Sequence, residues 1–282
     1  MPILFALASA AVYGVADYLG GRASRLHPSA VVTLVGQMVS FAMVLVAVAS
    51  MGTPVPSSGT LAWGAVAGVA GAVGLTSLYH AFAHGAVTVV APLSAVVGAV
   101  LPVGAGLAQG ERPAGIAYVG IVLAVVAVAL VSGAVGERRR PTPPAIVGFA
   151  VLAGTGFGVL FVALDRSDGG SGFWPLVAAR AASVPLLLVL CLVTGARPTR
   201  RRGGVGGLAI AMVAGSLDML ANLLYLAASR EGLLSIVAVV ASLYPASTVA
   251  LAFVIDRERV DRWQSVGMAV AVGALVLVTL GR

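Results

Sequence analysis

Lysine is absent from this sequence, cysteine occurs once, and charged residues of either sign are scarce. Only 10% of the 282 residues are charged, whereas 60% are hydrophobic, and the mean hydropathy is +1.05. A soluble globular domain carries about 25% charged residues, because its surface faces water. The shortage of charge therefore excludes a soluble globular protein. The single cysteine, Cys191, excludes an intrachain disulfide and any metal site built from several cysteines.

The motifs of nucleotide-binding and hydrolytic enzymes are missing as well. The chain has no Gly-x-x-x-x-Gly-Lys-Ser/Thr loop, which argues against an ATP-driven pump in this chain, and neither His-Glu-x-x-His nor Gly-x-Ser-x-Gly. The three histidines, His27, His80 and His84, have no spacing suited to a metal ion. We therefore expect no enzymatic activity, no catalytic residue, no metal and no cofactor.

Positive charge is present only as arginine. The 17 arginines and 10 acidic residues give a formal net charge of +7. Most of the arginines lie between apolar runs, where they act in membrane proteins as topology determinants and phospholipid contacts. The expected partners are therefore membrane lipids and a small-molecule solute, not nucleic acid, and a homodimer is kept open beside a monomer.

Long apolar runs fill almost the whole chain. A helix that crosses a bilayer needs about 20 mostly apolar residues, and ten such runs separated by turn residues and charge can be placed here. We predict an all-α integral membrane protein with ten transmembrane helices, over residues 3–19, 29–51, 61–83, 87–108, 115–132, 145–164, 173–193, 205–229, 233–255 and 263–280. Gly20 and Gly21 are expected to end the first of them.

The two halves of the chain resemble one another. Residues 1–136 and 145–282 each hold five predicted helices, and residues 137–144 form a basic, proline-rich linker between them. Gly85 matches Gly232 and Glu111-Arg112 matches Glu258-Arg259 in one register, and near the other end of each copy Tyr13-Gly14 corresponds to Phe157-Gly158. Because five is an odd number, the second copy enters the membrane from the opposite side. The sequence therefore predicts two inverted repeats, an architecture that recurs in secondary transporters.

The distribution of arginine predicts an orientation. Loops after the odd-numbered helices hold most of the arginines, including 138–140 and 200–202, whereas the opposite side holds few. Cytoplasmic loops are enriched in positive charge, so these loops are expected to be cytoplasmic and both termini to lie outside. The expected location is the inner (plasma) membrane of the cell.

The repeated pairs resemble a known family. Two five-helix units, the aromatic-Gly pairs Tyr13-Gly14 and Phe157-Gly158, and the pair Gly110-Glu111 after the fourth helix (Arg257-Glu258 in the second copy) are similar to the EamA family of the drug/metabolite transporter superfamily. This resemblance covers nearly the whole chain. It implies ten helices around a central cavity and the export of amino acids or other small metabolites. Many relatives keep both termini in the cytoplasm, so the orientation predicted here departs from them.

Polar side chains inside the apolar runs are the candidates for a binding site. Ionisable groups at bilayer depth cost several kcal/mol unless they are paired or face water. Asp218, Asn222, Tyr225 and Ser229 follow one another at helical spacing and share one face. Together they are suited to a substrate ammonium or, through Asp218, to a proton; a structural contact with another helix is the alternative. Arg180 requires a partner, either a substrate carboxylate or Asp218, unless its side chain extends to the interface.

Three further polar residues are weighed in the same way. His80 is a candidate for substrate binding and proton coupling because imidazole titrates near neutral pH, although a hydrogen bond to a neighbouring helix would also explain it. Gln37 would bind substrate or contact another helix. Asp17 is expected to form a salt bridge with Arg22 and Arg25 at the membrane interface.

Prolines interrupt the fourth predicted helix of each copy. Pro92 and Pro102 lie in the first copy and Pro245 in the second. Each removes a backbone N–H, so these positions are predicted to be hinges or cavity walls, or otherwise fixed kinks. The sequence as a whole predicts a secondary active transporter of small metabolites that works by alternating access. A lipid-linked substrate flippase and a membrane subunit without transport activity are the alternatives.

Overall fold

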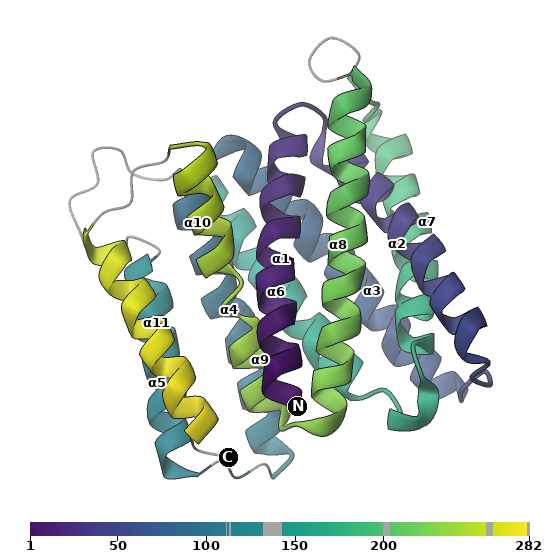
Figure 1. The fold of residues 1–282 in the computed structure, drawn as a ribbon. Helices are drawn as coiled ribbons and strands as arrows, with labels where there is room; N and C mark the ends of the chain where they lie inside the picture. The colour runs from purple at the N-terminus through teal and green to yellow at the C-terminus, as the bar shows by residue number, and fades with distance from the viewer. Residues whose placement is uncertain (111, 113, 132–142, 200–203, 258–261, 281–282) are drawn as a thin grey trace.

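The structure, a computed structural model, describes residues 1–110, 112, 114–131, 143–199, 204–257 and 262–280, and within them all regular elements are helical (Figure 1). The predicted linker is described only at residues 143 and 144, and Glu111, Glu258 and Arg259 lie outside the described residues, as do the arginines at 138–140 and 200–202. The elements are α1 (Pro2–Ser24), α2 (Ser29–Met51), α3 (Ser58–His84), α4 (Val87–Ala108), α5 (Gly115–Val131), α6 (Pro144–Asp165), the short 3₁₀ helix η1 (Gly169–Ser171), α7 (Trp174–Thr194), α8 (Gly204–Glu231), α9 (Leu234–Ala241), α10 (Pro245–Ile255) and α11 (Arg262–Leu280).

The described part of the chain holds eight segments long and apolar enough to cross a membrane. They are α1, α2, α3, α4, α6, α7, α8 and the combined α9–α10 segment, and the shortest has 21 residues. At 1.5 Å per residue, 21 residues span about 30 Å, the thickness of the hydrocarbon core. The protein is therefore a multi-pass membrane protein. Helices α5 and α11 fall outside this set, so the total of ten spans stays a prediction.

The first helix is longer than predicted. It runs to Ser24, and Gly20 and Gly21 lie inside it instead of ending it. A side chain at Gly20 would overlap the ring of Tyr79, and one at Gly21 would approach the ring of Phe82 to 2.6 Å. Both glycines therefore allow α1 to pack closely on α3, which is why they did not mark a helix end.

The ninth predicted helix is divided into two. Ser242, Leu243 and Tyr244 form a turn between α9 and α10. Pro245 has no N–H to continue the helical pattern, and the amides of Leu243 and Tyr244 donate instead to the carbonyl oxygens three residues before them, at 3.1 and 3.3 Å. By contrast, Pro92 and Pro102 lie inside α4 without dividing it.

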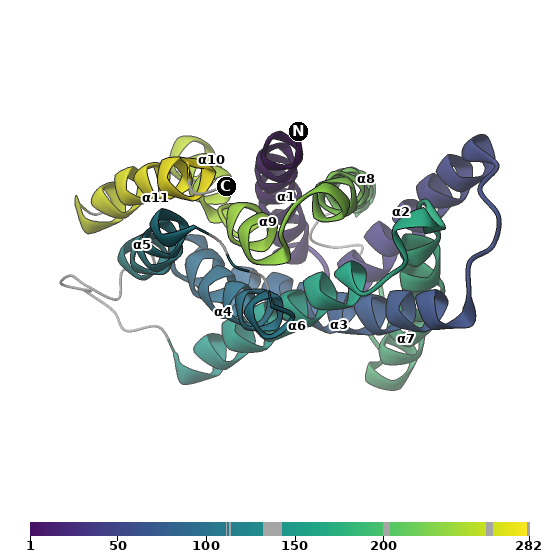
Figure 2. The same ribbon diagram turned by 90° about the horizontal axis from the view of Figure 1, so that it is seen from below.

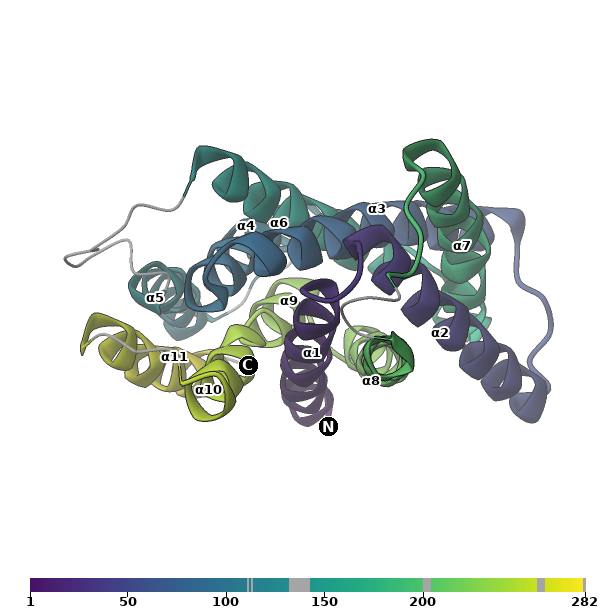
Figure 3. The same ribbon diagram turned by 90° about the horizontal axis from the view of Figure 1, so that it is seen from above.

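The helices form two layers with a helix pair at one edge. Figures 2 and 3 show α4, α6, α3 and α7 in one layer, facing α10, α9, α1 and α8 in the other. Helix α1 packs along α8, α3 packs along α6, and α2 contacts both α7 and α8. The pair α5–α11 lies at the opposite edge, against α4.

Close packing between neighbouring helices depends on glycine. A side chain at Gly68 in α3 would overlap the backbone of Ala179 in α7, and one at Gly215 in α8 would overlap the backbone of Gly36 in α2. Small residues allow membrane helices to approach until their backbones are in van der Waals contact.

Candidate functional site

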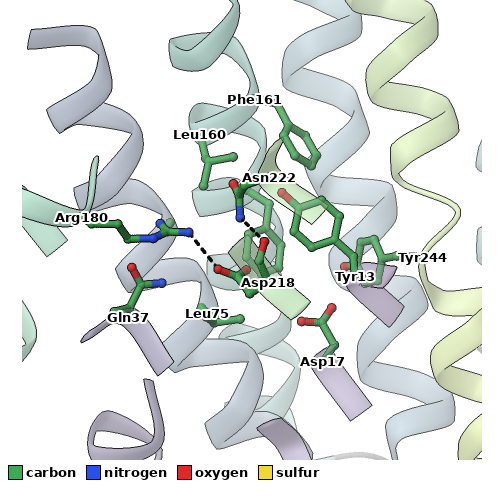
Figure 4. A pocket seen from close by; sticks show the side chains of 12 residues that line it. Tyr13, Asp17, Gln37, Leu75, Leu160, Phe161, Arg180, Asp218, Asn222 and Tyr244 are labelled. Carbon is green, nitrogen blue, oxygen red and sulfur yellow. Dashed lines mark hydrogen bonds and ion pairs between the residues drawn. The ribbon is translucent and has the colours of Figure 1, made fainter. Parts of the chain in front are cut away.

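A cavity lies between the two layers, near the middle of the bundle. The space that the centre of a water-sized molecule can reach is about 30 Å³, enough for about two waters. We refer to it as the central cavity, and it is lined by Tyr13, Asp17, Gln37, Gly71, Leu75, Phe157, Leu160, Phe161, Arg180, Asp218, Asn222 and Tyr244 (Figure 4).

A buried ion pair forms one wall of the central cavity. Arg180 Nη2 of α7 lies 2.8 Å from Asp218 Oδ2 of α8, and the side chains are 2% and 10% exposed. The sequence left open whether Arg180 pairs with Asp218 or extends to the interface, and the structure brings the two together. Each charge compensates the other at a depth where an isolated charge would be costly.

Amide groups extend this wall on both sides of the ion pair. Asn222 Nδ2 donates a hydrogen bond of 2.8 Å to the backbone oxygen of Asp218, one turn earlier. Ser183, one turn after Arg180, donates a hydrogen bond of 2.9 Å to Gln37 Oε1 of α2. Four predicted site residues, Arg180, Asp218, Asn222 and Gln37, therefore meet at one place although they come from three helices.

Several buried polar atoms of the cavity-lining residues have no hydrogen-bond partner among the described residues. They are Arg180 Nε, Asn222 Oδ1 and the hydroxyl of Tyr13. Buried polar groups in folded proteins are nearly always satisfied, so groups left unsatisfied at a cavity need an explanation. Unsatisfied donors and an acceptor on residues that line a cavity are suited to water or to a bound solute.

Asp17 also lines the central cavity, and the predicted salt bridge with Arg22 and Arg25 is wrong. Those arginines bind Asp256 at the end of α10, with distances of 3.3 Å from Arg22 Nη1 and 3.2 Å from Arg25 Nη1. Asp17 is 4% exposed and forms no hydrogen bond or ion pair with any described residue. Because α1 continues to Ser24, Asp17 lies deep in the helix and one turn after Tyr13, instead of at its end.

Aromatic rings form the remaining wall. Phe161 stacks on Tyr225 at 4.3 Å between ring centroids, and Tyr13 lies 6.4 Å from Phe161. Tyr244 meets Phe157 edge to face at 6.3 Å, and its hydroxyl lies 2.6 Å from Ser94 Oγ of α4. Tyr225 is fully buried behind Phe161 and does not line the cavity.

Sequence reasoning used Tyr13 and Phe157 only as markers of the repeat. A signal that could have pointed to the cavity is the four-residue spacing that places Tyr13 one turn before Asp17, and Phe157 one turn before Phe161, on one face of a helix.

The structure places His80 away from the central cavity. Its ring lies 4.4 Å from the rings of both His84 and Phe149, toward one end of α3. Pro92 and Pro102 are not cavity residues either, whereas Pro245 directly follows the cavity residue Tyr244. Among the described residues, no group of three histidine, cysteine or acidic side chains is placed to hold a metal ion.

Comparison with solved structures shows the fold. One crystal structure superimposes with a TM-score of 0.72, at 18% sequence identity, over 99% of this chain and 96% of the other. Its title, "Crystal structure of protein", states no activity. No curated protein matches this chain.

Comparison with sequence families is more specific. Residues 143–280, which include α6 to α11, match the sequence model of the EamA-like transporter family. This match covers Arg180, Asp218 and Asn222 of the central cavity. The all-helical, multi-pass architecture described above agrees with it. The chain belongs to the EamA-like transporter family.

Proposed function

We propose that this membrane transporter is a secondary active exporter of small metabolites or drug-like amphiphiles, which binds its solute in the central cavity and works by alternating access. The observation that carries the proposal is the Arg180–Asp218 ion pair, buried beside unsatisfied polar atoms between the two layers. Ionisable residues at this depth mark substrate and ion pathways in membrane proteins.

The size of the central cavity supports a change of conformation during transport. Its 30 Å³ hold about two waters, whereas pockets for small solutes have volumes of about 300–1,000 Å³. A solute can therefore enter only when the layers separate at one side.

The packing of the helices supports the proposed inverted repeat. Helix α1 packs along α8, and α3 packs along α6. If α1 corresponds to α6 and α3 to α8, each contact is the counterpart of the other. Two equivalent contacts between the halves would provide two equivalent packings, one open to each side of the membrane.

Asp218 is the proposed coupling residue. Its negative charge holds Arg180 at 2.8 Å, and a proton on Asp218 would weaken that contact and release the guanidinium toward the cavity. The position of His80 outside the cavity leaves Asp218 as the better placed of the two predicted proton carriers.

The test is a thermal-shift screen of the detergent-purified protein against amino acids, amines, nucleosides and hydrophobic cations. A solute that binds only the folded protein raises its melting temperature. We expect a shift that is lost in Asp218→Asn and kept in Asp256→Asn, which removes a carboxylate outside the cavity. A shift of equal size in all three proteins would place the binding site elsewhere.

A lipid-linked substrate flippase is the second candidate. A separate apolar cavity of about 240 Å³ lies between α4, α5 and α9, with Ala99, Ile121 and Val239 in its lining. Its volume and apolar lining suit an acyl chain. Exchange of a fluorescent phospholipid between leaflets of proteoliposomes, measured by dithionite quenching, would favour this candidate, and its absence would favour the aqueous solute.

A further inference from the structure

We infer that the solute is an organic cation, with its ammonium group at Asp17 against the rings of Tyr13 and Tyr244. This inference rests on the proposed function and names the substrate class of the same site. Asp17 forms no hydrogen bond or ion pair with any described residue, although it is 4% exposed and lines the central cavity.

The balance of charge in the central cavity favours a cation. Asp17, Arg180 and Asp218 are its three ionisable acidic and basic side chains, and Arg180 and Asp218 compensate each other at 2.8 Å. Ionised Asp17 therefore leaves the cavity with one uncompensated negative charge. Burying such a charge is costly, and a positively charged ligand reduces that cost.

Figure 4 shows the Asp17 carboxylate below the rings of Tyr13 and Tyr244, with Asp218 between it and Arg180. The guanidinium of Arg180 is thus already paired with Asp218. A bound anion would have to displace Asp218 from Arg180 and would still face the negative charge of Asp17. The position next to Asp17 is left for a cation.

The aromatic lining distinguishes an organic cation from a metal ion. Four aromatic residues line the cavity, namely Tyr13, Phe157, Phe161 and Tyr244. The face of an aromatic ring attracts a poorly hydrated ammonium group, and cages of such rings bind quaternary ammonium ligands. Calcium instead requires about six to eight oxygen ligands. One carboxylate surrounded by rings fits an ammonium ion.

The proposed repeat shows that a carboxylate is not needed here for packing. If Tyr13-Gly14 corresponds to Phe157-Gly158, then Asp17 corresponds to Phe161 in α6. The equivalent position of the other half is thus occupied by an apolar ring, which stacks on Tyr225. A helix of this fold accepts an apolar residue at this point, so a structural role does not account for Asp17.

The experiment compares charged and neutral ligands of the same shape on the full-length purified protein. Choline, tetraethylammonium and phenyltrimethylammonium are the cationic probes, and 3,3-dimethylbutan-1-ol is the neutral isostere of choline. Affinity is obtained from the dependence of the melting temperature on ligand concentration. We expect at least one cation to bind, and 3,3-dimethylbutan-1-ol to bind at least about tenfold more weakly than choline or not at all, a difference of about 1.4 kcal/mol.

Variants of the carboxylates test the position. Asp17→Asn should weaken binding of the cation at least about tenfold, whereas Asp256→Asn, the same substitution outside the cavity, should leave it within about twofold. If Asp17→Asn does not fold, Asp17→Glu, which keeps the charge, and Tyr13→Leu, which removes a ring, take its place. Binding should persist in Asp17→Glu and weaken in Tyr13→Leu.

Two outcomes would overturn the inference. If anionic or zwitterionic solutes stabilise the protein and their binding requires Arg180 but not Asp17, the proposed transport site stands and the cationic substrate class is wrong. If no cation raises the melting temperature of the wild-type protein, the substrate class is wrong, and transport of another class of solute then decides the proposed function separately.

Discussion

At the scale of single residues, one wall of the central cavity is a buried ion pair between Arg180 and Asp218. Removing one partner leaves the other charge buried without compensation, whereas removing both leaves no charge. We expect Asp218→Ala to lower the free energy of unfolding by about 3–5 kcal/mol in the wild type, and by much less when Arg180 is already replaced by Met.

Denaturant unfolding in detergent of the wild type, Asp218→Ala, Arg180→Met and the double variant measures this coupling. Asp218→Asn should be less destabilising than Asp218→Ala, because the amide oxygen can still accept a hydrogen bond from Arg180. Equal losses in both backgrounds would show that the two side chains do not stabilise each other in the folded protein.

The sequence predicted part of this site. Asp218 and Asn222 share a helical face, and charged groups in apolar runs are rare, so these two residues and Arg180 could be found from helical spacing and from the scarcity of charge. Asp17 could not be placed in the cavity because α1 was expected to end at Gly20, which would have left this carboxylate near the interface. The hydrogen-bond partners of each group depend on tertiary contacts, which helical spacing does not specify.

At the scale of helices, glycine determines how closely neighbouring helices approach. Gly215 of α8 lies against the backbone of Gly36 in α2, whereas Gly206, on the same helix, has open space around it. Gly215→Leu should separate α2 from α8 and lower the free energy of unfolding by about 1–3 kcal/mol.

Gly206→Leu is the matched control and should change stability little. Comparing the melting temperatures of both variants with the wild type measures the effect. Similar melting temperatures for the two variants would contradict close packing at Gly215.

Helix positions were predicted well where a long apolar run has the length that a bilayer requires, as in α2 and α4. The predictions failed where one residue type has two uses. Glycine was interpreted as a helix end at Gly20, but it serves there as a point of close contact with Tyr79. Proline divides the chain at Pro245 but not at Pro92, and only the neighbouring helices decide which of these occurs.

At the scale of the whole molecule, two hydrogen bonds indicate which connecting segments lie at the same end of the bundle. His27, after α1, accepts a hydrogen bond of 3.0 Å from the amide of Thr199, after α7. At the other end, Trp174 donates a hydrogen bond of 3.0 Å to the backbone oxygen of Thr53, after α2. Four helices, α3 to α6, lie between Thr53 and Trp174 in the sequence. Because Thr53 and Trp174 lie at the same end of the bundle, the chain between them crosses the bundle an even number of times, which supports a membrane crossing by α5.

The arginine distribution predicts which end is cytoplasmic. With Cys191 replaced by serine, a cysteine at Thr199 should react with a membrane-permeant maleimide but not with an impermeant one added to intact cells. A cysteine at Thr53 should react with both reagents. The reverse pattern would place both termini in the cytoplasm and would agree with the orientation common in the family.

Solute uptake into proteoliposomes tests the central claim most directly. The solute identified by thermal shift is added in labelled form to vesicles that contain the wild type, Asp218→Asn or Asp256→Asn, with and without a proton gradient. The account predicts gradient-dependent uptake by the wild type and by Asp256→Asn, and its loss in Asp218→Asn. Gradient-dependent uptake by Asp218→Asn at the wild-type rate would contradict a transport site at the Arg180–Asp218 pair.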